Sequence, residues 1–500
     1  MSLLPAGFAA DLGPDALPRD SRFSSADLAP VPASARTWGL WHFAALWVGM
    51  SVCIPTYMLS AALIEAGLTW QWSLAAILLG NAIVLVPLLV NAHAGARYGI
   101  PFPVYVRAAF GLRGAHVPSL LRAVVACGWF GIQTWIGGLA IHEMLTIIWP
   151  GWAALGGGAI FMGYALPHYI AFLLFWLINV YFVWAGTESI KWLETAAAPL
   201  LIAAGLALLW WAQARVGGFG AMFSGTTTLG VAREFSAALF LPWVTAMVGF
   251  WATLALNVPD FTRHATSQRA QAVGQSLGLL ATMPLFAFIG VAVTSATVKI
   301  YGEAIWNPVT LVGRIAAESE STIVALLALG VLLVATLTTN IAANIVAPAA
   351  SIANLKPKQI SLRLGGLIAA TMGIVLIPWR LLDAYQTWLL SYSGLLGAVG
   401  GIMVCDYLVV RRGVLDVRAL YEEGGVYWYQ GGVARGAMIA LAAGVGTALL
   451  GAVVPALHFL FSGAWFSAAI VAAVVHWALA PRLSAPSGAP TAFNSAEASR

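Results

Sequence analysis

Apolar stretches long enough to cross a lipid bilayer follow one another along almost the whole chain. A membrane-spanning helix needs about 20 residues, and such stretches lie at residues 38–63, 72–96, 118–148, 163–185, 191–213, 235–256, 271–297, 322–349, 363–379, 383–410, 436–456 and 461–480. Only short connections join them. The pattern therefore predicts an all-α integral membrane protein with about twelve transmembrane helices.

The composition and the chain ends support this class. Hydrophobic residues make up 61% of the 500 residues and charged residues only 9%, whereas a soluble domain carries about 25% charged residues. The first residues lack the basic start and the apolar run of a signal peptide. We expect residues 1–37 to form a retained, disordered tail and residues 481–500 a second tail. The three cysteines (Cys53, Cys127 and Cys405) are far apart in apolar stretches, so they suggest neither a disulfide framework nor a metal site.

The Lys and Arg residues predict the orientation in the membrane. Fourteen of them lie in loops on the same side as the N-terminus and five in loops on the other side. Cytoplasmic loops carry the excess of these residues. Both termini are thus predicted to be cytoplasmic, in an inner or plasma membrane. The bilayer accounts for the net charge of +5, and no nucleic-acid partner is needed.

Two spans look unfit to be continuous helices. The first contains Gly49 and Pro55, and the sixth contains Pro242 and Gly249. Proline removes a backbone donor, and paired interrupted helices in two halves point to a transporter site near the midplane. These two spans occupy corresponding places if the first ten spans form two five-span halves, at 38–213 and 235–410, followed by two helices within 436–480. A simple proline kink at each position is the alternative.

Polar side chains interrupt the third and eighth spans. In GWFGIQTWIGG (128–138), Trp129 and Gln133 are four residues apart and share one helix face. The eighth span carries Thr338, Thr339, Asn340 and Asn344, and hydroxyls together with freed carbonyls can hold a small cation. Alternatively, the threonines bond to their own helix and the asparagines join helices, and Trp129 belongs to an interfacial aromatic belt.

Ionisable residues are scarce inside the spans, and their placement bears on the coupling ion. A proton-driven carrier keeps a carboxylate or a histidine on its path. The candidates near span ends are Glu65, His142, Asp260, Asp383 and Asp406. None is well centred, which favours sodium. A proton site at Glu143, Glu188 or Glu194 remains the alternative.

Enzyme motifs are incomplete. IHEMLT (141–146) begins like a zinc-protease motif, but no second histidine follows in register. LGGGA (155–159) has neither a preceding strand nor a following P-loop lysine. We therefore expect no enzymatic activity and no cofactor.

Several motifs together resemble the nucleobase-cation-symport-1 family, whose members carry uracil, cytosine, purines, allantoin and hydantoins. The resemblance covers most of residues 38–435 in the family's order. The matching stretches are YGIPFPVYVRAAFGLRGA (98–115), GWFGIQTWIGG, GFWATLALNVPDFTR (249–263), TTNIAANIVAP (338–348), PWRLLDAYQTWLL (378–390), DYLVVRRG (406–413) and GVYWYQGGV (425–433).

The resemblance implies a leucine-transporter-like fold: two inverted five-helix repeats, with helices one and six broken, plus two extra helices. It also assigns site residues by position. Trp129 and Trp251 resemble the indoles that sandwich a flat heterocycle, and Gln133 and Asn344 match the amides that bind its edge. Gly249 and Leu389 correspond to a substrate contact and a gate. The family's sodium site maps onto the carbonyls of Gly49, Val52 and Ala335 and the hydroxyls of Thr338 and Thr339.

Two positions depart from the hydantoin-transporting members of the family. Cys53 replaces an amide and Phe250 replaces a glycine, and both should border the substrate. The resemblance thus implies a symporter for a nucleobase or cyclic ureide such as uracil, allantoin or hydantoin, coupled to sodium. A proton-coupled carrier of the same substrates and an uncoupled facilitator or channel are the alternatives. The oligomeric state stays open, with a monomer expected.

Overall fold

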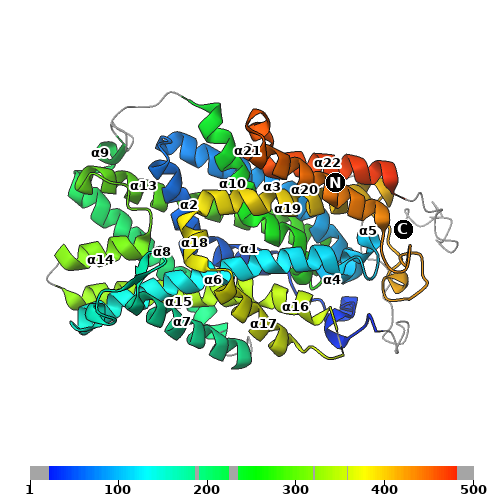
Figure 1. The fold of residues 1–500 in the computed structure, drawn as a ribbon, viewed down its shortest axis with the longest axis horizontal. Coiled ribbons are helices and arrows are strands. Elements are labelled where there is room, and N and C mark those ends of the chain that lie inside the picture. Colours follow the sequence, from blue (N-terminus) through cyan, green and yellow to red (C-terminus); the bar gives the residue numbers. More distant parts are fainter. Residues whose placement is uncertain (1–21, 186–190, 224–234, 319–320, 357, 481–500) are drawn as a thin grey trace, which may run out of the picture.

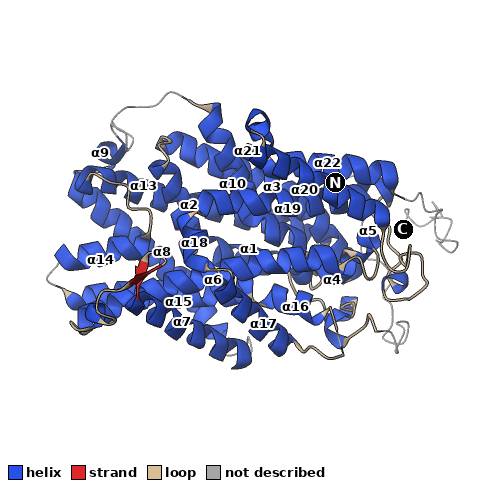
Figure 2. Ribbon diagram, in the orientation of Figure 1, coloured by secondary structure: helices blue, strands red, loops and turns tan. Residues whose placement is uncertain are grey.

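Helices form nearly all of the regular structure (Figure 2). The computed structural model describes residues 22–185, 191–223, 235–318, 321–356 and 358–480. Within these ranges the strands are β1 (Ile160–Phe161) and β2 (Tyr164–Ala165), which pair as an antiparallel hairpin. The helices are α1 (Leu40–Ser51), α2 (Ile54–Glu65), α3 (Trp70–Tyr98), α4 (Phe102–Tyr105), α5 (Arg107–Phe110), α6 (His116–Ile148), α7 (Leu166–Ala185), α8 (Lys191–Val216), α9 (Phe219–Phe223), α10 (Ala237–Asn257), α11 (Pro259–Thr262), α12 (Gln268–Leu277), α13 (Met283–Tyr301), α14 (Pro308–Glu318), α15 (Thr322–Asn344), α16 (Val346–Ala353), α17 (Leu362–Val375), α18 (Pro378–Asp383), α19 (Tyr385–Cys405), α20 (Arg435–Val453), α21 (His458–Ser462) and α22 (Ala464–Leu479).

The predicted spans coincide with helices. Among the described residues, 9 helical segments are long and apolar enough to cross a membrane, or up to 11 if each of two bent pairs forms one span. The shorter apolar helix α17 lies where the ninth span was predicted. The all-α membrane class is therefore confirmed. Two of the spans contain a π-helical turn, at Gly278–Thr282 between α12 and α13 and at Asp406–Val410 after α19, and neither turn was predicted.

The first span is broken where the sequence predicted. Helices α1 and α2 meet at an angle of 56°. Between them Val52 leaves the helical conformation and Cys53 is extended, with φ −147° and ψ 159°. Pro55 occupies the second position of α2, where its missing N–H costs no helical hydrogen bond. The break exposes main-chain groups in the interior of the molecule.

The break expected inside the sixth span is absent. Helix α10 continues through both Pro242 and Gly249, and the only interruption before α11 is the single residue Val258. Pro242 lies near the start of α10, in its second turn, where its ring disturbs only the first turn. Gly249 packs tightly against α19 and leaves no carbonyl free. The expectation of a broken sixth helix at these residues was wrong, and α10 and α11 together read as one span of 26 residues.

The described helices arrange themselves around α6 and α10. In Figure 1, α6 crosses the middle of the molecule with α7 and α15 on one side and α19 on the other, and it contacts all three. Helix α10 packs between α3 and α19. Outer helices instead present apolar side chains, such as Trp210 on α8 and Leu449 on α20, which are 71% and 59% exposed. Such a surface suits lipid.

Part of the N-terminal tail is ordered, in contrast to the expectation. Residues 22–37 contain two short helical turns and bury the side chains of Phe23 and Leu28. The Tyr421 hydroxyl donates to the Leu28 carbonyl at 2.6 Å, and Arg36 donates to the Ala96 carbonyl at 2.6 Å. The apolar side chains give this segment enough buried surface to pack. Residues 1–21 and the C-terminal tail from residue 481 lie outside the described residues.

Candidate functional site

Aromatic side chains from three helices meet beside the break between α1 and α2. Trp129 of α6 contacts Phe250 of α10 edge to face, with ring centroids 5.2 Å apart. On α19, Tyr385 and Tyr392 lie 5.9 and 6.4 Å from the same indole. The Trp129 N–H donates to the Tyr392 hydroxyl at 3.1 Å. Trp129 therefore lies deep in the bundle, and an interfacial aromatic belt does not describe its position.

Trp251 is turned away from Trp129. Its N–H lies 3.0 Å from Asn81 Oδ1 on α3 and 2.9 Å from Met283 Sδ on α13, and its ring meets Trp47 edge to face at 5.0 Å. Phe250 lies between the two predicted stacking partners, since it contacts Trp251 at 4.9 Å as well as Trp129. The structure thus places an aromatic trio where the sequence suggested an indole pair.

The two edge-reading amides lie on the facing helices α6 and α15. The Gln133 side chain is buried, and its Oε1 has no hydrogen-bond partner among the described residues. Asn344 is the last residue of α15, and its Nδ2 donates to Asn340 Oδ1 at 3.0 Å. Asn340 in turn bonds to Thr134 of α6 and Asn179 of α7. Asn179 was not singled out from the sequence, because a lone asparagine in an apolar helix carries no pattern.

The remaining predicted substrate residues have mainly packing contacts. Cys53 caps the start of α2, and its Sγ lies 3.2 Å from Thr56 Oγ1. A β-carbon at Gly249 would clash with the Ser393 hydroxyl and lie 3.1 Å from the Leu389 carbonyl. Leu389 is fully buried on α19. Gly249 and Leu389 therefore lie together at the contact of α10 with α19. Tyr385 and Tyr392, which border Trp129, were missed because nothing in the sequence predicts which face of α19 points inward.

The five residues predicted to hold sodium line one cavity. This cavity of about 260 Å³ lies between α1, α8 and α15, and its walls include Gly49, Val52, Ala335, Thr338 and Thr339. A β-carbon at Gly49 would meet nothing within 4 Å, so its backbone faces open space. The Thr338 hydroxyl donates to the Ala335 and Val334 carbonyls, at 3.1 and 3.2 Å, which leaves its lone pairs available. Among the side chains that the structure describes, those lining this cavity carry no charge.

A second, larger cavity begins near Asn344. Its volume is about 320 Å³, and it extends from Ile341 and Ile345 on the α15 and α16 side to Asp27 and Arg263 at the end of the molecule that holds the N-terminal segment. The Arg263 guanidinium donates to the Asp27 carbonyl at 3.0 Å. This cavity therefore extends from the residues next to Asn344 towards the end of the molecule that holds the N-terminal segment.

Glu143, the predicted proton-site candidate whose side chain the structure describes, lies away from the aromatic trio. Glu143 is 14 residues after Trp129 on α6, which at 1.5 Å per residue is about 21 Å, and it packs against Gly313 of α14. Near the same end His142 accepts a hydrogen bond from the Trp152 indole at 3.0 Å. Glu188 and the side chain of Glu194 lie outside the described part of the chain.

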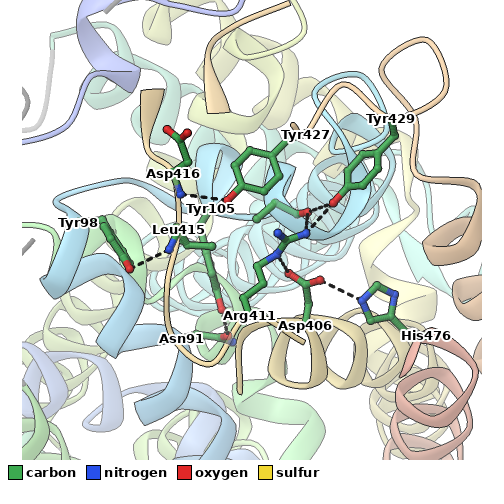
Figure 3. Close-up of polar contacts among 11 residues, drawn as sticks. Asn91, Tyr98, Tyr105, Asp406, Arg411, Leu415, Asp416, Tyr427, Tyr429 and His476 are labelled. Carbon is green, nitrogen blue, oxygen red and sulfur yellow. Dashed lines mark hydrogen bonds and ion pairs between the residues drawn. The ribbon is translucent and has the colours of Figure 1, made fainter. Parts of the chain in front are cut away.

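The other ionisable residues near span ends have structural partners. Asp260 accepts from the Phe102 N–H at 2.8 Å, and Asp383 accepts from the Tyr164 hydroxyl at 3.0 Å. Asp406 pairs with Arg411 at 2.6 Å and with His476 of α22 at 3.1 Å, as Figure 3 shows. The sequence predicted that Asp406 lies near a span end, but it did not predict its pairing with Arg411 and His476.

Comparison with known proteins identifies the family. Residues 30–471 match the family described as permease for cytosine/purines, uracil, thiamine, allantoin. The purine-uracil permease NCS1 of Arabidopsis thaliana is 41% identical over 491 residues, covering 95% of this chain and 80% of the relative. The allantoin permease of Bacillus subtilis (strain 168) is 39% identical over 459 residues, covering 91% of this chain and 92% of the relative.

Solved structures agree with this likeness. The structure of Mhp1, a nucleobase-cation-symport-1 family transporter in a closed conformation with bromovinylhydantoin bound, has a TM-score of 0.74 and 26% identity, and the match covers 91% of this chain and 95% of that chain. The inward-facing conformation of Mhp1 has a TM-score of 0.75 and 25% identity, covering 91% and 93%. The fold is the leucine-transporter-like fold that the sequence resemblance implied, and the chain is a transporter and not an enzyme. This chain belongs to the nucleobase-cation-symport-1 family of permeases.

Proposed function

We propose that the protein is a secondary active symporter that imports a flat, neutral nucleobase or cyclic ureide together with sodium by alternating access. The observation that carries this proposal is the convergence of Gly49, Val52, Ala335, Thr338 and Thr339 on one cavity beside the break between α1 and α2. Gly49 and Val52 come from the first span and the other three residues from the eighth, so two segments distant in sequence line the cavity. Their carbonyls and hydroxyls are the oxygens that would hold the ion.

The chemistry of this cavity suits sodium better than a proton. A small hard cation prefers several oxygen ligands, and the described lining residues supply carbonyl and hydroxyl oxygens, with no carboxylate among them. A neutral oxygen site has nothing to protonate near neutral pH, because histidine is the side chain that ordinarily titrates there. Sodium coupling therefore remains our proposal over proton coupling, whose candidate Glu143 lies far along α6.

The aromatic and amide groups suit a flat ring with a polar edge. Stacking on an aromatic face contributes about 0.5–1.5 kcal/mol beyond burial and accepts any flat ring. The unpartnered Oε1 of Gln133 and the amide of Asn344 supply hydrogen-bonding groups for the edge. Relatives described as purine-uracil and allantoin permeases support this substrate class.

Uptake into proteoliposomes tests the proposal. The purified protein would be reconstituted, and labelled uracil, allantoin and hydantoin would be offered under an inward sodium gradient, a pH gradient or no gradient. We expect accumulation above equilibrium for at least one ring under the sodium gradient only, and unchanged uptake by Glu143→Gln. Accumulation under the pH gradient alone would indicate proton coupling, and equilibration without accumulation would indicate a facilitator. Either result would overturn the sodium symport proposal.

A further inference from the structure

We propose that the Asn344 amide is fixed with its Oδ1 available to the substrate as a hydrogen-bond acceptor, and that Asn340 and Asn179 are positioning residues that fix this direction. The inference rests on the proposed function, since it takes Asn344 to contact the transported ring. It narrows the substrate class to rings that carry an N–H at the contacted position, as cyclic imides and ureides do.

The direction of this amide chain is set at its far end by main-chain carbonyls. Asn179 Nδ2 donates to the Phe175 carbonyl at 2.8 Å. A carbonyl can only accept, so the opposite atom of the Asn179 amide, Oδ1, is the one that faces Asn340. Asn340 Nδ2 lies 3.2 Å from that oxygen.

Two groups on α6 fix the orientation of the Asn340 amide in the same direction. Its Nδ2 lies 3.3 Å from the Phe130 carbonyl and 3.1 Å from Thr134 Oγ1. The Thr134 hydroxyl donates its own hydrogen to the Phe130 carbonyl at 2.7 Å. Towards Asn340, its oxygen can therefore only accept. Rotating the Asn340 amide by 180° would set its oxygen against three acceptors. Asn340 Oδ1 must therefore point towards Asn344.

Asn344 inherits the direction from Asn340. Because Asn340 presents its Oδ1, which can only accept, Asn344 donates to it from Nδ2, and the two atoms lie 3.0 Å apart. The Asn344 Oδ1 then has no hydrogen-bond partner among the described residues. Asn179, Thr134 and Asn340 are fully buried, so water does not compete for these bonds, and the direction is maintained along the chain.

Gln133 differs from Asn344 in this respect. Its buried Oε1 lacks a partner, and no hydrogen bond ties its amide to a main-chain carbonyl, among the described residues. The Gln133 amide is therefore able to rotate and offer either a donor or an acceptor. The site combines one fixed requirement at Asn344 with one adaptable contact at Gln133.

Matched N-methyl ligands test the fixed requirement. Dissociation constants for uracil, 1-methyluracil and 3-methyluracil, and for hydantoin and its two N-methyl isomers, would be measured with the purified full-length protein in sodium. We expect one isomer of each pair to bind at least about tenfold more weakly than the parent, because a methyl group replaces the N–H that Asn344 Oδ1 accepts. If both isomers of the rings that bind matched the parent, the inference would be wrong.

Variants separate this inference from the proposed function. Asn340→Leu releases the Asn344 amide, so we expect parent affinity to fall about tenfold while the parent-to-isomer ratio collapses towards one. Asn179→Leu should act in the same direction. Asn179→Asp should retain the ratio, because a buried carboxyl stays protonated, and it can then donate to the Phe175 carbonyl while its other oxygen accepts from Asn340. Asn91→Leu is the matched control, because Asn91 is a buried amide that bonds the Ala255 carbonyl outside the site. It should leave the ratio unchanged.

The outcomes are distinguishable. Loss of binding in Asn344→Leu with a wild-type ratio in both Asn340→Leu and Asn179→Leu would overturn the positioning role and leave the proposed substrate site standing. Wild-type affinity in Asn344→Leu would overturn the substrate contact itself. If Asn340→Leu fails to fold, the isomer ratio of the wild-type protein and the two Asn179 variants still test the positioning role.

Discussion

Phe250 determines how much of the Trp129 face a ligand can cover. Its ring stands nearly perpendicular to both indoles, at 81° to Trp129 and 88° to Trp251, and it is 8% exposed. The sequence resemblance implies a glycine at this position in hydantoin-transporting members of the family, so we expect the Phe250 side chain to add bulk beside the proposed stacking surface. We therefore expect Phe250 to influence which rings fit, whereas Trp129 should hold any flat ring.

Substituting the two residues should separate these roles. Phe250→Ala should change the order of affinities, with a hydantoin bearing a bulky 5-substituent gaining about tenfold relative to uracil, since one aromatic ring is removed from the site. Trp129→Ala should weaken all flat rings by a similar factor. Competition binding with uracil, hydantoin and the substituted hydantoin measures both. A uniform shift in Phe250→Ala would contradict the role in selection.

The sequence was informative for residues whose neighbours are set by helix periodicity. Trp129 and Gln133 were expected on one face, and both are buried in the bundle. The orientation of Trp251 was not predictable, because it depends on Asn81 and Met283, which come from two other helices. The bonds of Asn340 were missed for the same reason.

Helix α10 approaches α19 closely at Gly249. The Ser393 hydroxyl bonds to the Leu389 carbonyl one turn earlier on α19 and occupies the space beside the Gly249 α-carbon. Small residues allow such close approach between membrane helices. This contact explains why Gly249 lies in an unbroken helix, and why its presence was misread as a sign of a break. Pro55, by contrast, adjoins the extended residue Cys53 and marks a real one.

Adding one methyl group at Gly249 should disturb this contact. Gly249→Ala places a β-carbon against Ser393 and the α19 backbone, so we expect a loss of about 1–3 kcal/mol in stability. Gly330→Ala on α15 is the control, since a β-carbon there meets nothing within 4 Å. Thermal unfolding in detergent measures both variants. Equal melting temperatures for Gly249→Ala and wild type would show that the helices can separate without cost.

A buried ion-pair cluster joins the last helix to the rest of the molecule. Asp406 at the end of α19 contacts both His476 of α22 and Arg411, whose guanidinium also bonds the Tyr429 hydroxyl at 2.6 Å (Figure 3). Burial alone would lower the pKa of Arg411, but the Asp406 carboxylate together with Tyr429 and Tyr427 more than offsets it, so the pKa of Arg411 is raised. The guanidinium therefore stays charged and remains paired with the Asp406 carboxylate.

Removing the cation from this cluster should destabilise the protein. Arg411→Gln leaves the Asp406 carboxylate buried without its main partner, and breaking such a pair costs about 3–5 kcal/mol. Arg412→Gln is the control at the neighbouring exposed position. We expect a large drop in melting temperature for Arg411→Gln only. Equal drops for the two variants would show that general charge, and not the pairing with Asp406, matters.

The architecture of the whole molecule was predictable because bilayer crossing dictates helix length and polarity. The pairing of distant segments was not, since the contact of Asp406 with His476 spans 70 residues and leaves no local pattern. The five residues proposed to hold sodium could be predicted in part. Their positions followed from the resemblance, and their convergence on one cavity appears only in three dimensions.

Ligand titration in sodium against choline, at fixed ionic strength, tests the central claim most directly. Substrate should bind more tightly in sodium, with little dependence on pH between about 6 and 8, because the described lining residues of the cavity include no group that ordinarily titrates there. By reciprocity, substrate should tighten sodium by the same factor. Thr338→Val with Thr339→Val should erase the sodium effect, while Thr336→Val, whose hydroxyl bonds the Leu332 carbonyl outside the cavity, should keep it. Equal affinities of the wild-type protein in sodium and choline would contradict sodium coupling.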